Sequence, residues 1–311
     1  MPSPRHPLDG LTVLDRGWLS SNNVLIHAAE GEAGAVLVDA SHVNHAEQTV
    51  ALVRHALNGA RLDRVVNTHL HSDHCGGNAA LQRAFDVAVF VPPGSADAVR
   101  GWDESRLSYD ALGQRCERFT IAGTLTPGDD VIAGGRRWQV LQAPGHDPDS
   151  VILFDAANGV LISADALWER GFGVVFPEIA GEPGFDDVGA TLDLIAGLRV
   201  RVVIPGHGPP FTDAAAAIAL ARSRLAGFQT EPARHARYAM KALMKYHVME
   251  VRQQALDALL AWAAATPILM QLWARHGVHE SESLTGWAAL VVRELVASGA
   301  LALSDGIVSD L

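Results

Sequence analysis

The chain has 311 residues, of which 49% are hydrophobic and 19% are charged, and its formal net charge is −11. This length fits one large or two smaller domains, and the composition excludes a disordered, low-complexity or membrane-spanning chain. With two cysteines, no apolar signal region in residues 1–10 and an acidic balance, we expect a soluble cytoplasmic protein that lacks a disulfide framework and is not a general nucleic-acid binder.

Residues 1–213 carry 15 basic and 27 acidic residues and alternate short β-rich runs with turn signals. Clusters of β-branched residues bounded by Gly, Pro, Asn or Asp predict strands at Leu11–Asp15, Val24–Ala28, Ala35–Asp39, Arg64–Thr68, Ala88–Val91, Trp138–Gln142, Val151–Asp155, Val160–Ala164 and Val202–Pro205. Helical patterns intervene at about 46–58, 78–84 and 187–198. Strands mixed with helices in this way predict an α/β layered domain over residues 1–213.

Residues 214–311 have a nearly neutral balance of 9 basic and 8 acidic residues and a helical pattern. We expect a helix over 214–228 behind an Asp213 cap, and another that begins near Pro232. Further helices are predicted at about 252–265, 267–276 and 284–298, and a hairpin around Asp305-Gly306. Short helices followed by a hairpin resemble a winged-helix module, so we predict a second, mainly helical domain over 214–311 with a packing or dimerisation role.

The strongest chemical signal is the run from Thr68 to Gly77, which contains His69, His71, Asp73 and His74 directly after an apolar strand. Four metal-ligand side chains within six residues cannot all face a hydrophobic core. Imidazole and carboxylate are ligands for Zn²⁺ and also suit iron or manganese. Gly76-Gly77 allows a sharp turn and a close backbone approach before the next helix.

Three further candidate ligands lie where other predicted strands end. His146 follows the Trp138–Gln142 strand, Asp165 follows Val160–Ala164, and His207 lies in the Pro205-Gly-His-Gly-Pro209 segment. Loops at the edge of a sheet can bring such distant side chains together. Taken one at a time, each residue could equally have a structural role, as Asp165 would in capping a turn.

Together these motifs identify the chain as a member of the metallo-β-lactamase fold superfamily, with the resemblance covering about residues 10–212 and including a strand that ends in Asp39. The resemblance implies an αββα sandwich of two sheets flanked by helices. It also implies two divalent metal ions, one held by His69, His71 and His146 and the other by Asp73, His74 and His207, with Asp165 as the bridging carboxylate. We expect zinc, with iron or manganese as alternatives.

Within this superfamily the sequence is most similar to the glyoxalase-II-like hydrolases, because His74 and Asp165 are both present. The glyoxalase-II Gly-Asp-x-Leu-Phe run is replaced by Ala164-Asp-Ala-Leu-Trp168. The C-terminal region looks more like the winged-helix tail of the β-lactamase-like-protein-2 group, some of whose members cut RNA.

We therefore predict a dinuclear metal-dependent hydrolase that uses a metal-bridging hydroxide as nucleophile. Asp73 and Asp165 would fix the geometry of the cluster, offset its charge and relay a proton. A thiolate leaves without a proton donor whereas an amine does not, which favours a thioester or another small acyl ester as substrate. The alternatives are a metal-dependent phosphodiesterase or ribonuclease and a metal-sensing regulatory protein. We expect no nucleic-acid or membrane partner, and a homodimer is one expected assembly.

Trp168–Phe176 follows Asp165 and is rich in aromatic residues and glycines. It could form a wall of the substrate pocket, or Phe172 and Phe176 could pack in the core. Arg170 could hold a substrate carboxylate or phosphate, or form a surface salt bridge. Cys75, between two ligands and the glycines, is predicted to be a small filler residue, with metal ligation or redox chemistry as the alternative.

Overall fold

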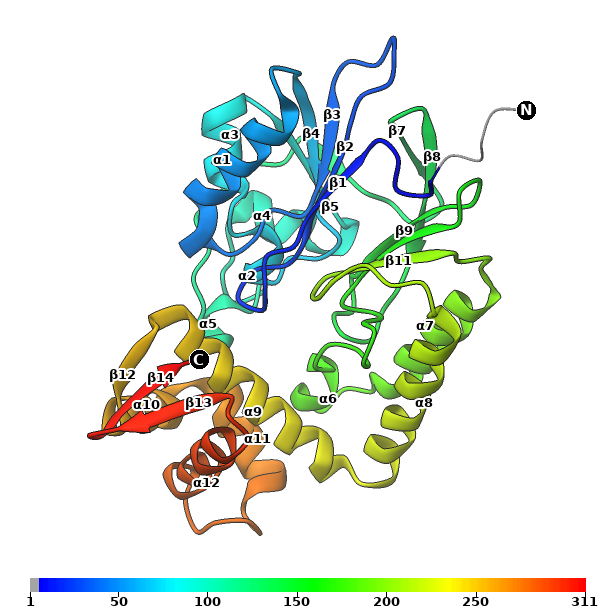
Figure 1. Ribbon diagram of the computed structural model, residues 1–311. Coiled ribbons are helices and arrows are strands. Elements are labelled where there is room, and N and C mark those ends of the chain that lie inside the picture. Colours follow the sequence, from blue (N-terminus) through cyan, green and yellow to red (C-terminus); the bar gives the residue numbers. More distant parts are fainter. Residues whose placement is uncertain (1–5) are drawn as a thin grey trace.

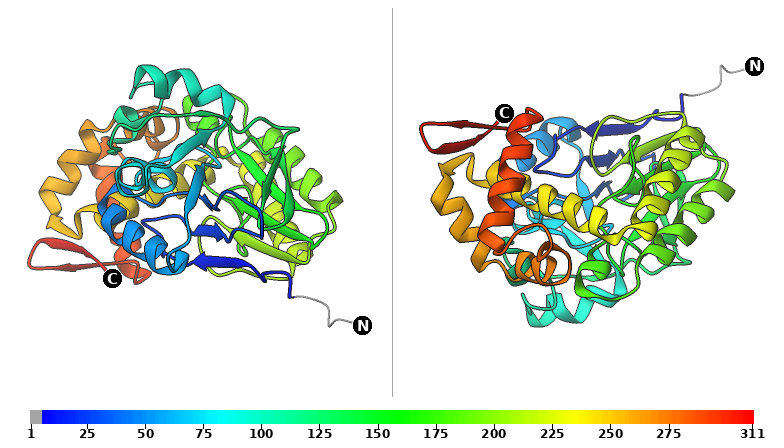
Figure 2. Two further views of the ribbon diagram at one scale, coloured as in Figure 1. Left: turned by 90° about the horizontal axis from the view of Figure 1, so that it is seen from above. Right: turned by 90° about the horizontal axis from the view of Figure 1, so that it is seen from below.

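Residues 6–311 of the protein, described by a computed structural model, form two sheets packed face to face, helices on both outer faces and a helical C-terminal lobe (Figure 1). Residues 1–5, which belong to the segment where we expect no apolar signal region, lie outside the described residues. Both views of Figure 2 place the C-terminal lobe to one side of the two sheets. The predicted αββα fold class with a C-terminal helical region is confirmed.

The first sheet has the strand order β1-β2-β3-β4-β5-β6. Its strands are β1 (Leu11–Leu14), β2 (Asn23–Ile26), β3 (Ala35–Val38), β4 (Leu62–Val66), β5 (Ala88–Val91) and β6 (Gly123–Thr124). From β3 to β6 neighbouring strands are parallel, so their carboxyl ends meet at one edge of the sheet. The helices that follow within this half are α1 (Ala46–Leu57), α2 (Ser72–Cys75), α3 (Asn78–Phe85), α4 (Ala96–Gly101) and α5 (Tyr109–Leu112).

The second sheet has the order β11-β10-β9-β8-β7. Its strands are β7 (Asp130–Ala133), β8 (Arg136–Gln142), β9 (Val151–Asp155), β10 (Val160–Ala164) and β11 (Val202–Pro205). The parallel pair in this sheet is β10 with β11, so these two strands also end at a common edge. Its helices are α6 (Phe176–Ala180), α7 (Phe185–Gly197) and α8 (Ala214–Thr230).

Alternation of side chains along the strands builds the layers. In β3, Val36 and Val38 face the space between the sheets, where they join Trp138 and Leu153 of the second sheet. Leu37, between them in sequence, belongs to the core beneath α1 and α3. Successive strand residues point to opposite faces, so a strand that is buried on both faces reads as a continuous apolar run.

The C-terminal lobe surrounds the long helix α9 (Pro232–Val251). Its other elements are β12 (Gln253–Ala255), α10 (Leu256–Ala265), α11 (Pro267–Leu272), α12 (Leu284–Ala297), β13 (Leu301–Ser304) and β14 (Ile307–Asp310). The core of the lobe contains Met240, Met244 and Trp287, and it also takes in Leu112 and Val174 from the sandwich region. The two parts of the molecule therefore share apolar contacts.

The expected division after residue 213 stays a prediction, and the packing places the change of core later in the chain. Buried residues of α8, such as Ala221 and Leu225, lie in the same core as β9–β11 and α7. The core of the C-terminal lobe begins with α9. In this arrangement α8 is an outer layer of the sandwich.

Most predicted elements are present, including the hairpin around Asp305-Gly306. Helix α10 begins at Leu256 rather than near 252, because Gln253–Ala255 pairs with β14 as a short strand. The helix predicted over 267–276 ends as α11 at Leu272 and continues as a π-helical turn over Trp273–Gly277. Strands β6, β7 and β12 and helices α2, α4, α5 and α6 were not predicted; each has only two to six residues, which is too short for a clear periodic signal.

Within residues 6–311, no helix by itself has the length and apolar character of a membrane span. The segments Leu256–Ala265 and Pro267–Gly277 meet those criteria only when taken together, and they are bent by 76° at the break between them.

His235 ties α9 to the segment in front of α6. Its Nε2 accepts a hydrogen bond of 3.0 Å from the Val175 backbone N–H, and the ring is buried against Phe185 and Phe228. Burial lowers the pKa of His235 to about 4, so the ring is a neutral acceptor at pH 7. The buried contact therefore depends on an uncharged imidazole.

We predict that His235→Leu lowers the free energy of unfolding at pH 7.5 by about 1–3 kcal/mol, because a buried N–H loses its acceptor. The unfolded-state pKa is near 6.5, so wild-type stability should fall as the pH drops from 6.5 towards 4, and the difference between wild type and variant should shrink. Urea denaturation of the wild type and the variant at pH 7.5, and again at a pH between 6.5 and 4, measures the free energies of unfolding. His279→Leu, at an exposed position, is the control, and equal effects of the two substitutions would contradict the assignment.

Candidate metal centre

The loop after β4 and the short helix α2 present four of the predicted ligands at the edge where the strands end. Buried amides hold this segment in place. Asn67 Nδ2 donates to the His74 carbonyl oxygen at 3.0 Å, and Asn67 Oδ1 accepts from Asn78 Nδ2 at 2.7 Å. The backbone that carries the ligands is therefore fixed by hydrogen bonds on its far side.

Gly76 and Gly77 bring α2 against the loop that follows β3. A Cβ atom on Gly76 would lie 2.4 Å from the backbone nitrogen of Val43, and one on Gly77 would lie 2.1 Å from the carbonyl oxygen of Ala40. Real Cβ atoms do not approach so closely, so larger residues would push α2 away. The close approach expected from this glycine pair is confirmed.

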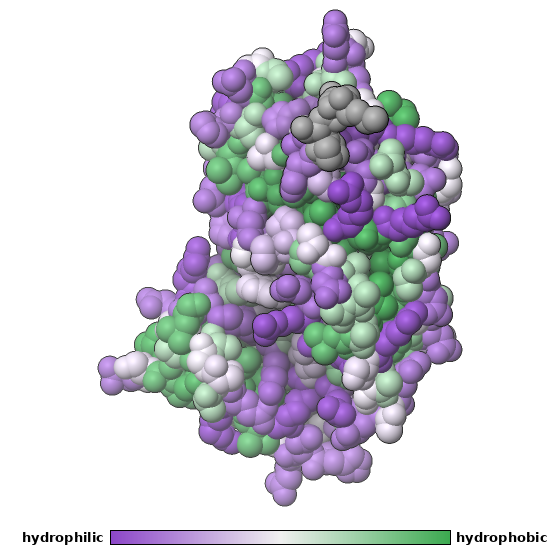
Figure 3. Space-filling model, turned by 45° about the vertical axis from the view of Figure 1, so that its right-hand side comes forward, coloured by the Kyte–Doolittle hydropathy of each residue, from purple (hydrophilic) through white to green (hydrophobic). Residues whose placement is uncertain are grey.

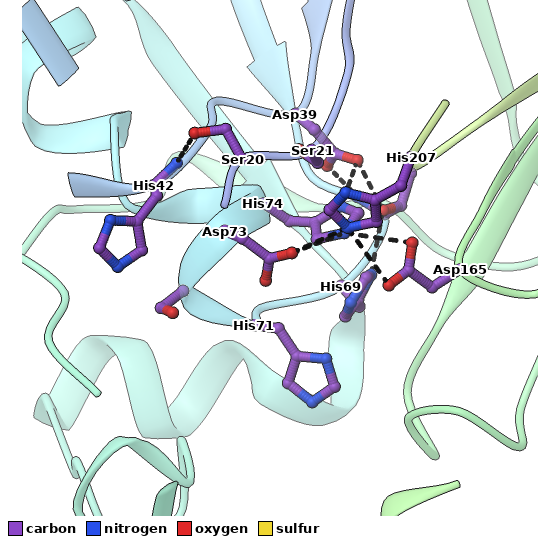
Figure 4. Close-up of polar contacts among 12 residues, drawn as sticks. Ser20, Ser21, Asp39, His42, His69, His71, Asp73, His74, Asp165 and His207 are labelled. Atoms are coloured by element: carbon purple, nitrogen blue, oxygen red, sulfur yellow. Dashed lines mark hydrogen bonds and ion pairs between the residues drawn. The ribbon is translucent and has the colours of Figure 1, made fainter. Parts of the chain in front are cut away.

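The other three predicted ligands lie at the ends of second-sheet strands. His146 follows β8, Asp165 follows β10 and His207 follows β11. Ala164 has a φ of 45°, a left-handed conformation that turns the chain just before Asp165. Figure 4 shows Asp73, Asp165 and His207 directed towards one another, whereas His42 points away.

All seven predicted side chains converge in two adjacent groups whose ligand atoms, within each group, lie no more than 4.8 Å apart. The first group is His69, His71 and His146, and the second is Asp73, His74, Asp165 and His207. This division agrees with the predicted ligand sets, and Asp165 is placed in the second group by distance.

Asp165 lies between the two groups. Its carboxylate oxygens are 3.5 Å from His146 Nε2, 3.5 Å from His74 Nε2 and 3.8 Å from His207 Nε2. The Trp168 indole N–H donates to Asp165 Oδ1 at 3.1 Å. A carboxylate in this position can contact ions in both groups.

Contacts on the far side of the rings orient the histidines. His74 Nδ1 donates to Asp39 Oδ2 at 2.8 Å, His146 Nδ1 to the Val174 carbonyl at 2.6 Å, and His207 Nδ1 to the Gly17 carbonyl at 3.2 Å. These tautomers follow from the partners, since the carboxylate and the carbonyls can only accept. Each Nε2 is thereby directed into the site, an arrangement common among metal-binding histidines.

The buried donor set fits divalent metal ions. The Nε2 atoms of His69 and His74 are buried and make no hydrogen bond with any described residue. Burying a polar atom without a partner costs free energy, so these two nitrogens require a partner of another kind. Five imidazoles and two carboxylates form a ligand set suited to zinc, iron or manganese.

The first group is electrically neutral near pH 7. Burial lowers the pKa of His71 and of His146 to about 4 and that of His69 well below its ordinary value. Neutral imidazole is the form that binds a metal ion, so this group needs no deprotonation.

The second group combines charges of opposite sign. Burial alone would lower the pKa of His74, but the carboxylates of Asp39, Asp73 and Asp165 raise it well above its ordinary value. Burial by itself would raise the pKa of Asp73 and of Asp165. The neighbouring His74 and His207 nevertheless lower the pKa of Asp73 to about 2 and hold the pKa of Asp165 well below its usual range. Both carboxylates are therefore ionised.

A cavity of about 590 Å³ opens onto His71, Asp73, His146, Asp165 and His207. Its far wall is formed by α9. Tyr246 of this helix lines the cavity, and its hydroxyl lies 2.9 Å from Ser72 Oγ, next to two of the ligands in sequence. The C-terminal lobe thus contributes directly to the space in front of the cluster.

Residues of the segment Trp168–Phe176 lie partly along the cavity and partly in the core, and a role of the segment in binding substrate stays a prediction. Trp168, Arg170 and Phe176 line the cavity, whereas Phe172 is buried in the core. Among the described residues Arg170 forms no ion pair, so the salt-bridge alternative is not seen. Cys75 is fully buried, and its sulfur lies 3.4 Å from the Leu70 carbonyl oxygen, as expected for a filler residue.

Two neighbours of the cluster were not predicted. Trp18 is 55% exposed and stacks on His207 with ring centroids 5.3 Å apart. Tyr246 is separated from Ser72 by 174 positions in the sequence. A lone aromatic residue near either chain segment gives no sequence signal of such a contact.

The chain matches the metallo-beta-lactamase superfamily over residues 16–207. A hydroxyacylglutathione hydrolase from Anaeromyxobacter dehalogenans is 32% identical over 197 residues, which are 60% of this chain and 67% of that protein. One from Idiomarina loihiensis is 29% identical over 119 residues, 38% of each chain. Across these curated relatives the matched stretch spans from 38% to 67% of the relative's length.

Two solved structures extend the likeness of fold to nearly the whole chain. A metallo-beta-lactamase family protein from Thermus thermophilus has a TM-score of 0.57 and 20% identity, covering 98% of this chain and 99% of its own. A beta-lactamase domain protein from Burkholderia ambifaria has a TM-score of 0.54 and 22% identity, covering 97% and 92%. The C-terminal lobe is therefore included in the similarity.

We predict that Gly206→Ala weakens metal binding at least about 10-fold, because the new Cβ would lie 2.1 Å from Asp165 Oδ1 and displace that carboxylate. Calorimetric titration of the chelator-treated protein with Zn²⁺ measures the affinity. Gly197→Ala is the matched control, since a Cβ there meets no atom within 4 Å. Unchanged affinity in Gly206→Ala would contradict the placement of Asp165.

Proposed function

The chain belongs to the metallo-beta-lactamase superfamily, and we propose that it is a dinuclear metal-dependent hydrolase whose substrate is a thioester or another small acyl ester. The observation that supports this most directly is the pair of adjacent ligand groups, with Asp165 between them, at the base of a cavity. A closed structural metal site would not face such a cavity.

In this proposal His69, His71 and His146 hold one metal ion, Asp73, His74 and His207 hold the other, and Asp165 contacts both. When bound, the ions would lower the pKa of a shared water towards neutrality and polarise the acyl oxygen of the substrate. Zinc is the metal that we propose, because histidine and carboxylate ligands suit it and the histidines of the first group are neutral at pH 7.

Residues around the ligands supply orientation and charge. Asp39 holds the His74 ring through its 2.8 Å hydrogen bond, and the Trp168 N–H fixes one oxygen of Asp165. The two ionised carboxylates, Asp73 and Asp165, balance the positive charge of the site and are the groups that we propose for proton transfer.

The leaving group favours a thioester. A thiol has a pKa of about 8.5, so it departs as a thiolate without a proton donor, whereas an amine from an amide requires one. The relatives named hydroxyacylglutathione hydrolase support the same choice, because their named substrate carries its acyl group on the sulfur of glutathione.

Three further aspects of the sequence-based hypothesis remain part of this proposal. The chain would act in the cytoplasm, consistent with its two free cysteines, and would take a small-molecule substrate. Helices α10–α12 followed by the β13–β14 hairpin are consistent with a winged-helix-like module in the C-terminal lobe.

The metal-loaded protein should hydrolyse acyl thioesters faster than amides, β-lactams and phosphodiesters, and a chelator should remove this activity. A panel of these four substrate classes, with liberated thiol measured for the thioesters, tests the proposal. Activity confined to phosphodiesters would instead support the nuclease alternative.

Mutating a residue that only hydrogen-bonds to a metal ligand typically lowers activity by roughly 10- to 100-fold, and we expect Asp165→Ala to lower turnover by more than this. The variant should also bind less metal, as measured by elemental analysis. Circular dichroism should show an unchanged fold. Asp193→Ala, an exposed carboxylate paired with Arg222, is the control. Full activity in Asp165→Ala would show that the bridging role is wrong.

A further inference from the structure

Apart from the ligands, the cavity in front of the cluster is lined by many apolar residues. Leu112 of α5, Phe176 of α6, and Leu243 and Met249 of α9 line it, together with Val174. Trp18 adds an exposed aromatic face beside His207. An apolar wall of this size next to a reacting centre is suited to a hydrocarbon chain or ring, because removing such groups from water is favourable.

Two arginines, Arg170 and Arg224, are among the residues that line this cavity. Arg170 lies at the tip of a tight turn closed by the backbone hydrogen bond from Trp168 N–H to the Gly171 carbonyl, at 2.7 Å. Arg224 of α8 packs against Gly171, where a Cβ atom would lie 2.5 Å from its Nη1. Arg224 thus contacts the residue that follows Arg170 in the chain, and Arg170 itself is exposed.

Neither arginine is neutralised within the part of the chain that the structure describes. Lys245, the third basic residue of the cavity, is paired with Asp310, but neither Arg170 nor Arg224 has an ion-pair partner among residues 6–311. Arg224 instead lies over the Tyr238 ring, 5.4 Å from its centroid. Besides the metal-centre carboxylates, the acidic residue of the cavity is Glu169, which is exposed on the same turn as Arg170.

Of the two arginines, Arg170 belongs to the acidic part of the chain, with 15 basic and 27 acidic residues over 1–213, whereas Arg224 belongs to the nearly neutral part after residue 213. On the face drawn in Figure 3, hydrophilic residues predominate and hydrophobic residues gather in separate patches. A carboxylate or phosphate accepts hydrogen bonds from guanidinium groups, so an anion in this cavity can pair with arginines that have no ion-pair partner within the described residues.

We propose that the substrate is an acyl thioester with an apolar acyl group and an anionic thiol carrier. The hydrocarbon part lies against α9 and Phe176, and a carboxylate or phosphate of the carrier lies between Arg170 and Arg224. This inference rests on the proposed hydrolase function and adds the chemical class of both halves of the substrate.

Thioether analogues test the inference without hydrolysis, because they lack the scissile carbonyl. Binding to the metal-loaded full chain is measured by calorimetry at low salt for S-hexyl derivatives of three carriers: glutathione, coenzyme A and the neutral N-acetylcysteamine. We expect at least one anionic derivative to bind about 10-fold or more tightly than the neutral one. The better of the two identifies a carboxylate or a phosphate as the group recognised.

Arg170→Gln and Arg224→Gln should each remove most of the advantage of the anionic carrier, and Arg224→Lys should restore part of it. Arg222→Gln is the matched control, because Arg222 lies on the same helix, is exposed and pairs with Asp193 outside the cavity. Equal binding of charged and neutral carriers, or equal effects of Arg222→Gln and Arg224→Gln, would overturn the assignment of the anion site.

The apolar half has its own test. Affinity should rise by up to about fourfold for each methylene added between S-methyl and S-hexyl derivatives of the better carrier. Ala242→Phe, which fills the cavity from α9, should weaken the hexyl derivative far more than the methyl one. No dependence on chain length would overturn this part of the inference.

The same measurements separate this inference from the proposed function. If the analogues bind as expected but no thioester is hydrolysed, the hydrolase proposal fails and the binding site stands. If thioesters are hydrolysed while carrier charge and chain length have no effect on binding, the hydrolase proposal stands and the substrate class is wrong.

Discussion

The site depends on keeping ionised carboxylates and imidazoles buried close to one another where the strands of the two sheets end. Asp165 is the centre of this arrangement, because histidine nitrogens of both ligand groups lie within 4 Å of its oxygens. Burying such a cluster costs free energy unless each charge has a partner of opposite sign. The positive charge of His74 and the negative charges of Asp73 and Asp165 offset part of this cost. The ends of the sandwich strands hold these groups in the protein interior, although water would solvate them more favourably.

Much of the ligand geometry is controlled by residues that bind no metal in our proposal. Asp39 and the carbonyls of Val174 and Gly17 determine which nitrogen each of three histidines presents. Glycines at 76, 77 and 206 leave room that any side chain would fill. The orientation of the ligands is thus determined by the residues that surround them.

The pattern of strands and helices predicted a layered α/β domain, whereas the αββα sandwich and the convergence of the seven side chains were implied by the resemblance of their motifs to the metallo-β-lactamase superfamily. The sequence did not indicate that α8 covers the second sheet, because the helical pattern of α8 does not show which part of the molecule the helix packs against. The contact between Tyr246 and Ser72 and the meeting of Arg224 with Gly171 depend on tertiary packing between distant segments. Such contacts leave no periodicity or spacing in a single sequence.

Helix α9 belongs to the core of the C-terminal lobe through Met240 and Met244, while Leu243, Tyr246 and Met249 form part of the cavity wall. None of these five residues belongs to the seven that meet at the strand ends. Substitutions on α9 can therefore change the shape of the cavity wall while the seven residues at the strand ends stay the same. In evolutionary terms, the residues that contact a substrate can change in the C-terminal lobe while the metal centre in the sandwich is conserved.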